Sequence, residues 1–254
     1  DASSANFAGN ISAGTISITP IVNFTGVSNL TGPTSISFGN AINGPGSLTL
    51  TGGSITFGGV ISDLSSFSLA STTTSITTWP SSITTKGLLN LTPGVVFNGS
   101  MTLSSISGPI TTSTIDGNES LTINAGTGYF SVGSIGTTAA MGQIELTANA
   151  QSFIQSIVTQ SQPITVNASI LLTASSTIDS TNGETASGAT ITLGPIGASS
   201  TGINAETLTI NATYLGTGSL ITLNGELGGG DNPLGAVTIQ GLSATSLVDV
   251  ASSI

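Results

Sequence analysis

The sequence predicts an all-β fold: one elongated parallel β-helix, or β-solenoid, of about 11 coils that spans residues 1–254. Three observations lead to this prediction. Short strand-like segments recur at similar intervals, their apolar residues alternate with Ser and Thr, and Gly or Asn stands between them. Charged residues make up only 5% of the chain, far below the roughly 25% of ordinary soluble domains.

The recurring segments give the repeat its length. Of the nine intervals between successive segments, six lie between 17 and 23 residues, and the others are 12, 27 and 29. This spacing is typical of a solenoid coil with two or three short strands, and the irregular intervals indicate inserted loops. The segments are SLTL at 47, SFSL at 66, LLNL at 88, SMTL at 100, SLTI at 120, QIEL at 143, PITV at 163, TITL at 190, TLTI at 207 and AVTI at 236.

Alternation within each segment predicts which side chains form the core. In Leu48-Thr49-Leu50, for example, both leucines point to one face and the threonine to the other. Stacked coils would therefore place Ile and Leu in interior columns and Thr in exterior columns. Like charges would repel at the ~4.8 Å strand spacing, which accounts for their scarcity. Gly and Asn suit the corners because they adopt left-handed backbone angles readily.

Two structural alternatives remain open at this stage. Alternating strands also fit an antiparallel β-sandwich of pilin type, although the periodicity near 20 residues favours the solenoid. The segment TANAQSFIQSIV (147–158) fits either one short helix or another strand with a loop.

The stretch GPGSLTLTGGSITFGGVIS (44–62) and the stretch GELGGGDNPLGAVTIQG (225–241) carry a resemblance to a known family. In each, a Gly-rich turn leads into a new alternating strand. This cadence resembles the filamentous-haemagglutinin-type repeats of two-partner-secretion adhesins, as a pattern over about residues 41–250. The resemblance implies an exported right-handed β-helix in a bacterial surface fibre or adhesin, and it implies no catalytic residue.

Composition excludes several classes of partner. The net charge is −10 and the only cation is Lys86, so the chain has too few basic residues to neutralise a row of phosphates or anionic lipids. We therefore expect no binding to nucleic acid. No apolar run reaches the ~20 residues of a spanning helix, so we expect no membrane insertion. The absence of cysteine fits a reducing compartment, and it also fits bacterial surface proteins that cross an outer membrane unfolded. We prefer the second interpretation and expect an extracellular or bacterial cell-surface location after removal of a signal peptide.

Catalytic chemistry has few residues to use. Without His or Cys, nucleophile–histidine systems and ordinary zinc sites cannot form, and we expect neither an enzyme nor a cofactor. Paired carboxylates in Gly- and Asn-rich turns are the remaining candidates, and the simplest interpretation is that solvent surrounds them. The alternative is calcium, which prefers hard oxygen ligands. The calcium candidates are Asp116, Glu119, Asp179, Glu184 and Asp231.

The aromatic residues and the Asn-x-Ser/Thr sequons are the remaining side chains with a possible function. The single Trp79 either packs at a coil corner, which we expect, or stacks on a sugar ring. Phe67, Tyr129 and Phe130 are expected inside the solenoid. Eight Asn-x-Ser/Thr sequons are potential glycosylation sites, although several are expected by chance in so Asn-, Ser- and Thr-rich a chain. These sequons begin at Asn10, Asn23, Asn29, Asn90, Asn98, Asn118, Asn167 and Asn211.

The ends of a solenoid present unpaired backbone, and no charged or helical cap is visible in the sequence. Residues 1–25 are strand-like and are a candidate strand-donating segment. We therefore expect a structural subunit of a surface filament or fibre that forms homopolymers through its ends. The alternative is an adhesin passenger domain that binds host protein or glycans through loops at 176–188 or 226–234. An ice-binding solenoid is a third hypothesis, weakened because Thr-x-Thr does not recur in every coil.

Overall fold

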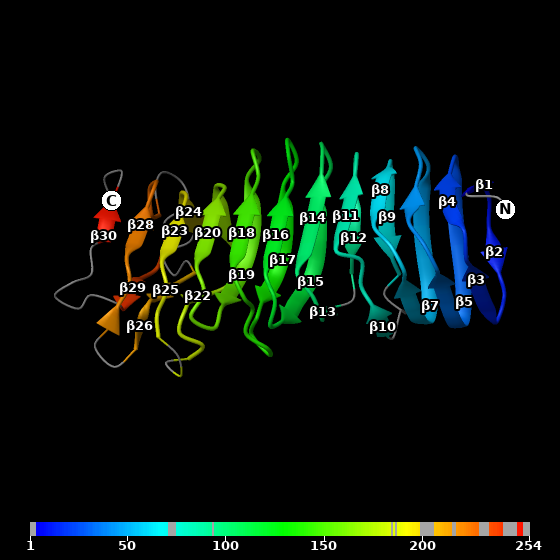
Figure 1. Cartoon of the computed structure of the whole chain (residues 1–254). Helices are drawn as coiled ribbons and strands as arrows, with labels where there is room; N and C mark the ends of the chain where they lie inside the picture. Colours follow the sequence, from blue (N-terminus) through cyan, green and yellow to red (C-terminus); the bar gives the residue numbers. More distant parts are fainter. Residues whose placement is uncertain are drawn as a thin grey trace.

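The computed structural model describes residues 4–70, 75–92, 94–183, 185, 187–198, 206–214, 217–228, 234–240 and 248–250. The strands stack side by side into a rod, with β1 near one end and β30 near the other (Figure 1). Every element of the described residues is a strand, and no helix there is long and apolar enough to cross a membrane.

One sheet of 12 strands runs the length of the rod and receives one strand from each coil. At ~4.8 Å per strand, its length is about 50 Å. Its strands, in stacking order, are β1 (Ser4–Phe7), β4 (Ile21–Phe24), β6 (Ile42–Asn43), β8 (Ile61–Leu64), β11 (Ser82–Thr85), β14 (Met101–Ser105), β16 (Leu121–Asn124), β18 (Ile144–Thr147), β20 (Ile164–Asn167), β23 (Ile191–Leu193), β28 (Ile221–Leu223) and β30 (Val248–Val250).

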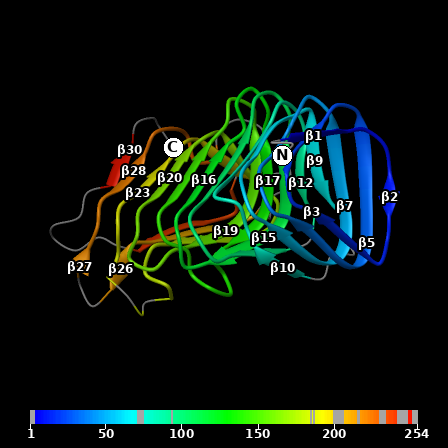
Figure 2. The same ribbon diagram turned by 45° about the vertical axis from the view of Figure 1, so that its right-hand side comes forward.

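A second sheet of 16 strands covers the rest of each coil, and in every coil the chain passes from one sheet to the other and back (Figure 2). Its strands are β2 (Ile11–Ser12), β3 (Thr15–Ile18), β5 (Val27–Phe38), β7 (Ser47–Phe57), β9 (Ser66–Leu69), β10 (Ser75–Thr78), β12 (Leu89–Leu91), β13 (Val95–Phe97), β15 (Ile110–Gly117), β17 (Phe130–Ile135), β19 (Ser152–Val158), β21 (Ile170–Leu172), β22 (Ser176–Asp179), β24 (Ile196–Ala198), β25 (Leu208–Asn211) and β29 (Val237–Gln240). A small third sheet pairs β26 (Thr213–Tyr214) with β27 (Thr217–Gly218).

The pairing pattern confirms the predicted parallel solenoid. Neighbouring coils pair in parallel, as β5 does with β7 and β14 with β16, whereas β26 and β27 form the antiparallel pair of the small sheet. The antiparallel sandwich considered as an alternative is therefore wrong. The coil count differs slightly from the expected 11, because the long sheet contains 12 stacked strands. The segment 147–158, for which a helix was an alternative, contributes instead to β18 and forms β19.

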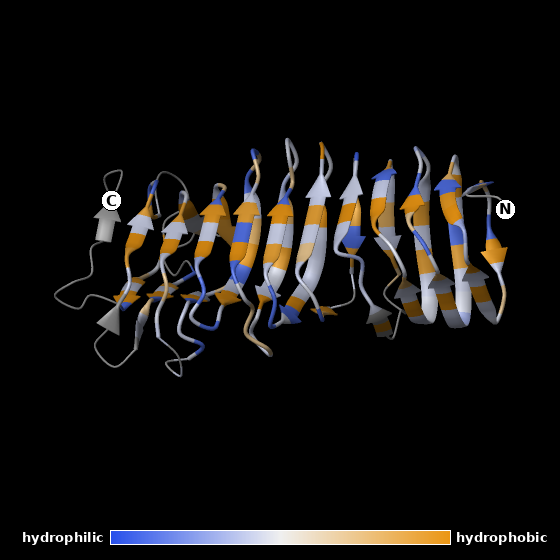
Figure 3. Cartoon of the chain, viewed as in Figure 1, coloured by the Kyte–Doolittle hydropathy of each residue, from blue (hydrophilic) through white to orange (hydrophobic). Residues whose placement is uncertain are grey.

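Alternation sorts the side chains as expected, and bands of apolar and polar residues follow one another along the strands (Figure 3). In β7 the side chains of Leu48, Leu50 and Ile55 are buried, and Thr49 and Thr51, which alternate with the leucines, are half-buried on the outside. Interior residues stack like on like, for example Leu30 on Leu50. Such columns keep β-branched and aliphatic side chains in continuous van der Waals contact along the rod.

Aromatic rings form part of the core near residues 38–97. The rings of Phe38 and Phe57 stack with centroids 5.9 Å apart. Phe57 also contacts Phe67 and Trp79, at 6.2 Å in each case, and Trp79 meets Phe97 edge-on at 4.8 Å. The expectation that Trp79 packs against the core is confirmed.

Residues 4–20 form the first coil of the chain's own rod, because β4, which begins at Ile21, already stacks on β1. Strand β1 pairs with β4, and both β2 and β3 pair with β5. The described part of the candidate strand-donating segment 1–25, residues 4–25, is thus built into the solenoid, and donation to another molecule stays a prediction.

Candidate functional site

The N-terminal coil is the first candidate site because no other described strand lies on its outer side. Among the described residues, β1, β2 and β3 each pair on one side only, so the backbone groups of their other edge face outward along the rod. Natural proteins protect such edges with charges, prolines, bulges or a covering element. The three strands read SANF, IS and TISI and contain neither a charged residue nor a proline.

The core itself reaches this open end. Ile16 is 5% exposed, whereas Phe7, Ile11 and Ile18 are only partly buried and pack against the core cluster. The Phe7 ring meets Phe24 edge-on at 5.5 Å, so it continues the interior column into the terminal coil. A further coil placed over these side chains would complete their burial.

Asparagine ladders begin in the same coil. The side-chain amide of Asn23 donates to Oδ1 of Asn6 at 3.3 Å, and Asn6, Asn23 and Asn43 occupy one column of the register. On the other sheet, Nδ2 of Asn29 donates to Oδ1 of Asn10 at 3.0 Å. Ladders of this kind link identical positions of stacked strands and favour addition of another strand in register.

The acidic candidates Asp116 and Glu119 do not have the arrangement that a calcium site needs. Oδ1 of Asp116, a residue only 8% exposed, accepts hydrogen bonds from the backbone N–H groups of Thr138 at 2.9 Å and Ala139 at 3.1 Å. Glu119 lies on the surface, after the end of β15. The structure therefore does not join Asp116 and Glu119 in one oxygen cage.

Asp179 organises the loop that follows β22. One carboxylate oxygen accepts bonds from the backbone N–H of Thr181 at 2.7 Å and from its hydroxyl at 2.6 Å, and the other accepts the N–H of Gly183 at 2.7 Å. Asn211 from the following coil donates to the Thr181 hydroxyl at 3.2 Å. These donors stabilise the buried charge, so the arrangement supports a structural role at the coil corner.

The remaining acidic candidates, Glu184 and Asp231, lie outside the described residues. Within the described part of the chain, no group of three or more potential ligand side chains is close enough to hold a metal ion. The loop candidates are only partly described: 176–179 is strand β22, and residues 229–233 lie outside the description.

The aromatic predictions have a mixed outcome. Phe67 and Phe130 are fully buried, as expected. The prediction for Tyr129 is wrong, since its side chain is 36% exposed. Tyr129 directly precedes the inward-pointing Phe130, and alternation turns it outward, where its ring meets Phe153.

The sequence analysis missed two features. The Asn ladders could have been found by aligning Asn6, Asn23 and Asn43 in successive coils. The outward position of Phe153 was not predicted, because the face on which its side chain lies is defined only when the segment 147–158 is a strand and not the alternative helix.

Comparisons with protein-family models, curated proteins and solved structures found no match for the chain.

Proposed function

We propose that the chain is a non-enzymatic structural subunit of an extracellular filament or surface fibre, and that it associates end to end with copies of itself. The observation that supports this proposal best is the N-terminal coil, in which unprotected strand edges, partly buried core side chains and the first residues of two Asn ladders coincide. Each of these features gains a partner when another coil is added.

The composition supports a structural role over a catalytic one. The chain contains no His and no Cys. The buried carboxylate of Asp116 accepts hydrogen bonds from backbone N–H groups of the next coil, and that of Asp179 from the loop that follows it. An exterior with few charges also suits repeated stacking, because close approach of like charges is avoided.

The alternative function is that of an adhesin passenger domain that binds host protein or glycans. A filament subunit binds its neighbours through the ends of the rod, whereas a passenger domain binds its ligand through the side of the rod or its loops. Blocking the ends would leave that activity intact.

A charge-placement experiment tests the end-to-end proposal. Lysine on an edge strand is a natural barrier to pairing, so Ala5→Lys combined with Thr15→Lys should abolish association. The matched control, Thr102→Lys with Ser113→Lys, adds the same charge at exposed positions of middle coils. Sedimentation velocity over a concentration series should show large species for the wild type and the control, and monomers for the end variant.

Two results would contradict the proposal. The first is a wild type that remains monomeric at the highest concentration. The second is equal loss of association in the end variant and the middle-coil control, which would assign the effect to net charge instead of to the N-terminal edge.

A further inference from the structure

One exterior column of the 16-stranded sheet changes character halfway along the rod. Its first six positions all have hydroxyl or amide side chains, as expected for a solvated surface, and the next three are Phe153, Leu171 and Gly197. The six polar members, in stacking order, are Asn29, Thr49, Ser68, Asn90, Thr111 and Ser131. The inner faces of these strands keep Ile154, Ile170 and Leu172 in the core, and the one polar inner position is the buried Ser152 of β19.

Phe153 is exceptional among the eight phenylalanines. Six of them are fully buried and Phe7 packs against the core at the open end, whereas Phe153 is half-buried on the outer face and lies outside the core cluster. Its ring meets that of Tyr129 edge-on, with centroids 6.0 Å apart. With Leu171 in the next coil, these residues form an apolar surface that we call the aromatic shelf: Tyr129, Phe153 and Leu171.

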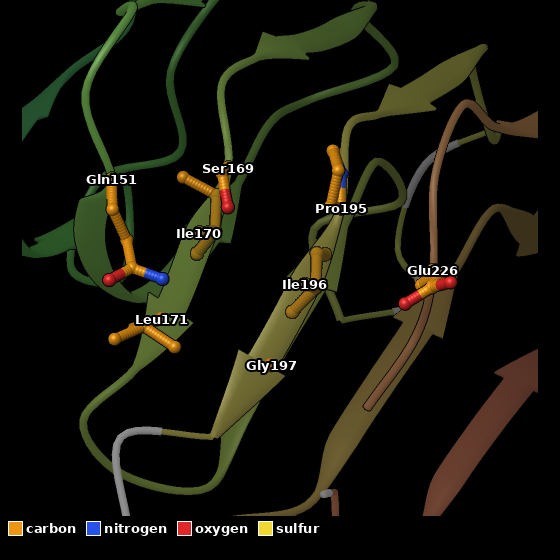
Figure 4. Close-up of a pocket in the computed structure, with 8 residues that line it drawn as sticks. All are labelled: Gln151, Ser169, Ile170, Leu171, Pro195, Ile196, Gly197 and Glu226. Carbon is orange, nitrogen blue, oxygen red and sulfur yellow. The ribbon is translucent and has the colours of Figure 1, made fainter. Parts of the chain in front are cut away.

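A hollow of about 190 Å³ adjoins the shelf. Leu171, Ile196 and Gly197 contribute to its lining, and Gly197 has no side chain at the position where the two preceding coils carry Leu171 and Phe153. Figure 4 shows Gln151 and Glu226 at opposite sides of this hollow, with Pro195 and Gly197 between them. Ser169 also lines it, so an amide, a hydroxyl and a carboxylate surround an apolar floor.

The shelf and the hollow follow the rod axis. Backbone bonds place Tyr129, Ser169, Pro195 and Glu226 at the same corner of successive coils: Ile110 donates to the Tyr129 carbonyl, Ser152 to that of Ser169, Ile170 to that of Pro195 and Ile196 to that of Glu226. Gln151 occupies this corner in the coil between Tyr129 and Ser169. Four coil steps therefore separate Tyr129 from Glu226, a length of about 19 Å.

This combination selects a ligand with apolar C–H faces and many hydroxyl groups. Aromatic side chains offer large apolar area at low entropic cost, while the amide, hydroxyl and carboxylate supply both donors and acceptors that orient a polar ligand. The only cation, Lys86, lies coils away in the bend that follows β11, and the net charge of −10 disfavours an anionic ligand. We propose that the aromatic shelf and the adjoining hollow bind a neutral oligosaccharide that lies along the rod.

This site acts through the side of the rod and does not depend on association of the ends. The first test uses isothermal titration calorimetry and saturation-transfer NMR with cellotetraose, maltotetraose and chitotetraose, and with tetragalacturonate as the anionic counterpart. We expect at least one neutral tetraose to bind, with saturation transferred from aromatic protons, and the anionic tetramer to bind at least tenfold more weakly.

Substitutions then locate the site. Tyr129→Ser combined with Phe153→Ser should weaken binding at least tenfold, and Glu226→Ala should weaken it severalfold. The matched control Val96→Ser removes an apolar side chain that is 63% exposed on another coil and should leave binding unchanged. Thermal unfolding of each variant confirms that the rod is intact.

The proposal is overturned if none of the three neutral tetraoses binds the wild type, or if the double variant binds as well as the wild type. Equal binding of tetragalacturonate would overturn the assignment to neutral ligands. A double variant that changes only the association state of the rods, with no tetraose bound by the wild type, would assign the shelf to contact between rods.

Discussion

Residues 27–57 and residues 170–211 build the same sheet in different ways. The first region forms two long strands, β5 and β7, whose interior residues match between coils, such as Ile36 on Ile55 and Phe38 on Phe57. The second is divided into strands of three or four residues. There, the hydroxyl of Thr181 donates to Asp179 and accepts from Asn211, which links the loop after β22 to β25 of the next coil.

The two regions differ because their coils differ in how uniform they are in length. Coils of nearly equal length keep their strands in register, so like side chains stack and the core is continuous. Where residues are inserted, the strands are interrupted, and buried polar groups must be satisfied by local hydrogen bonds. We therefore expect the N-terminal region to depend chiefly on apolar packing and the C-terminal region to depend more on its polar corners.

The largest expected effect is removal of a ring from the aromatic part of the core. Phe57→Ala should lower the free energy of unfolding by about 3–5 kcal/mol, because the cavity separates the rings of Phe38, Phe67 and Trp79. Urea denaturation followed by circular dichroism measures the change. Thr49→Ala, on the outer face of the same strand, should change it by less than about 0.5 kcal/mol. Similar losses for the two variants would refute the claim that stacked interior columns carry the stability of this region.

Close contact between coil corners gives the next effect. A Cβ atom at Gly46 would lie 2.3 Å from the carbonyl oxygen of Gly26 in the preceding coil, whereas a Cβ at Gly26 would lie 3.2 Å from the Cβ of Ala8. Gly46→Ala should therefore cost about 3 kcal/mol, at the upper end for overpacking, and Gly26→Ala clearly less. The midpoints of urea denaturation of the two variants provide the comparison, and equal midpoints would contradict the described packing of these corners.

The polar corner of the second region gives a smaller effect. Asp179→Ala should cost about 2 kcal/mol, because the N–H groups of Thr181 and Gly183 lose their acceptor. Hydrogen exchange at these two amides should accelerate more than exchange in β7. Glu119→Ala removes a carboxylate from the surface and should have little effect. Unchanged exchange at Thr181 and Gly183 in the Asp179 variant would show that the carboxylate does not order this loop.

Much of the fold could be predicted from the sequence because alternation and periodicity define strand faces and coil length. Leu48 and Leu50 lie inside and Thr49 outside, as the pattern indicates. The same reasoning failed for Tyr129, since aromatic character favours the interior but its place in the alternation turns it outward. The hydrogen bonds of Asp116 and Asp179 could not be predicted, because their donors are backbone groups placed by loop conformation.

The candidate sites were less predictable than the fold for a similar reason. The absence of charge and proline from the strands of the N-terminal coil can be read directly from the sequence. The aromatic shelf depends on which residues of successive coils share a column. That register is determined by loop lengths, which vary most in the region where the shelf and the hollow lie.

Negative-stain electron microscopy of the purified chain across a concentration series tests the central claim most directly. End-to-end association predicts filaments that lengthen with concentration and have an axial repeat near the length of one rod, about 50 Å. The Ala5→Lys and Thr15→Lys double variant, imaged in parallel, should give single rods. Isolated rods of the wild type at every concentration would contradict end-to-end association and would favour a domain that acts through the side of its rod.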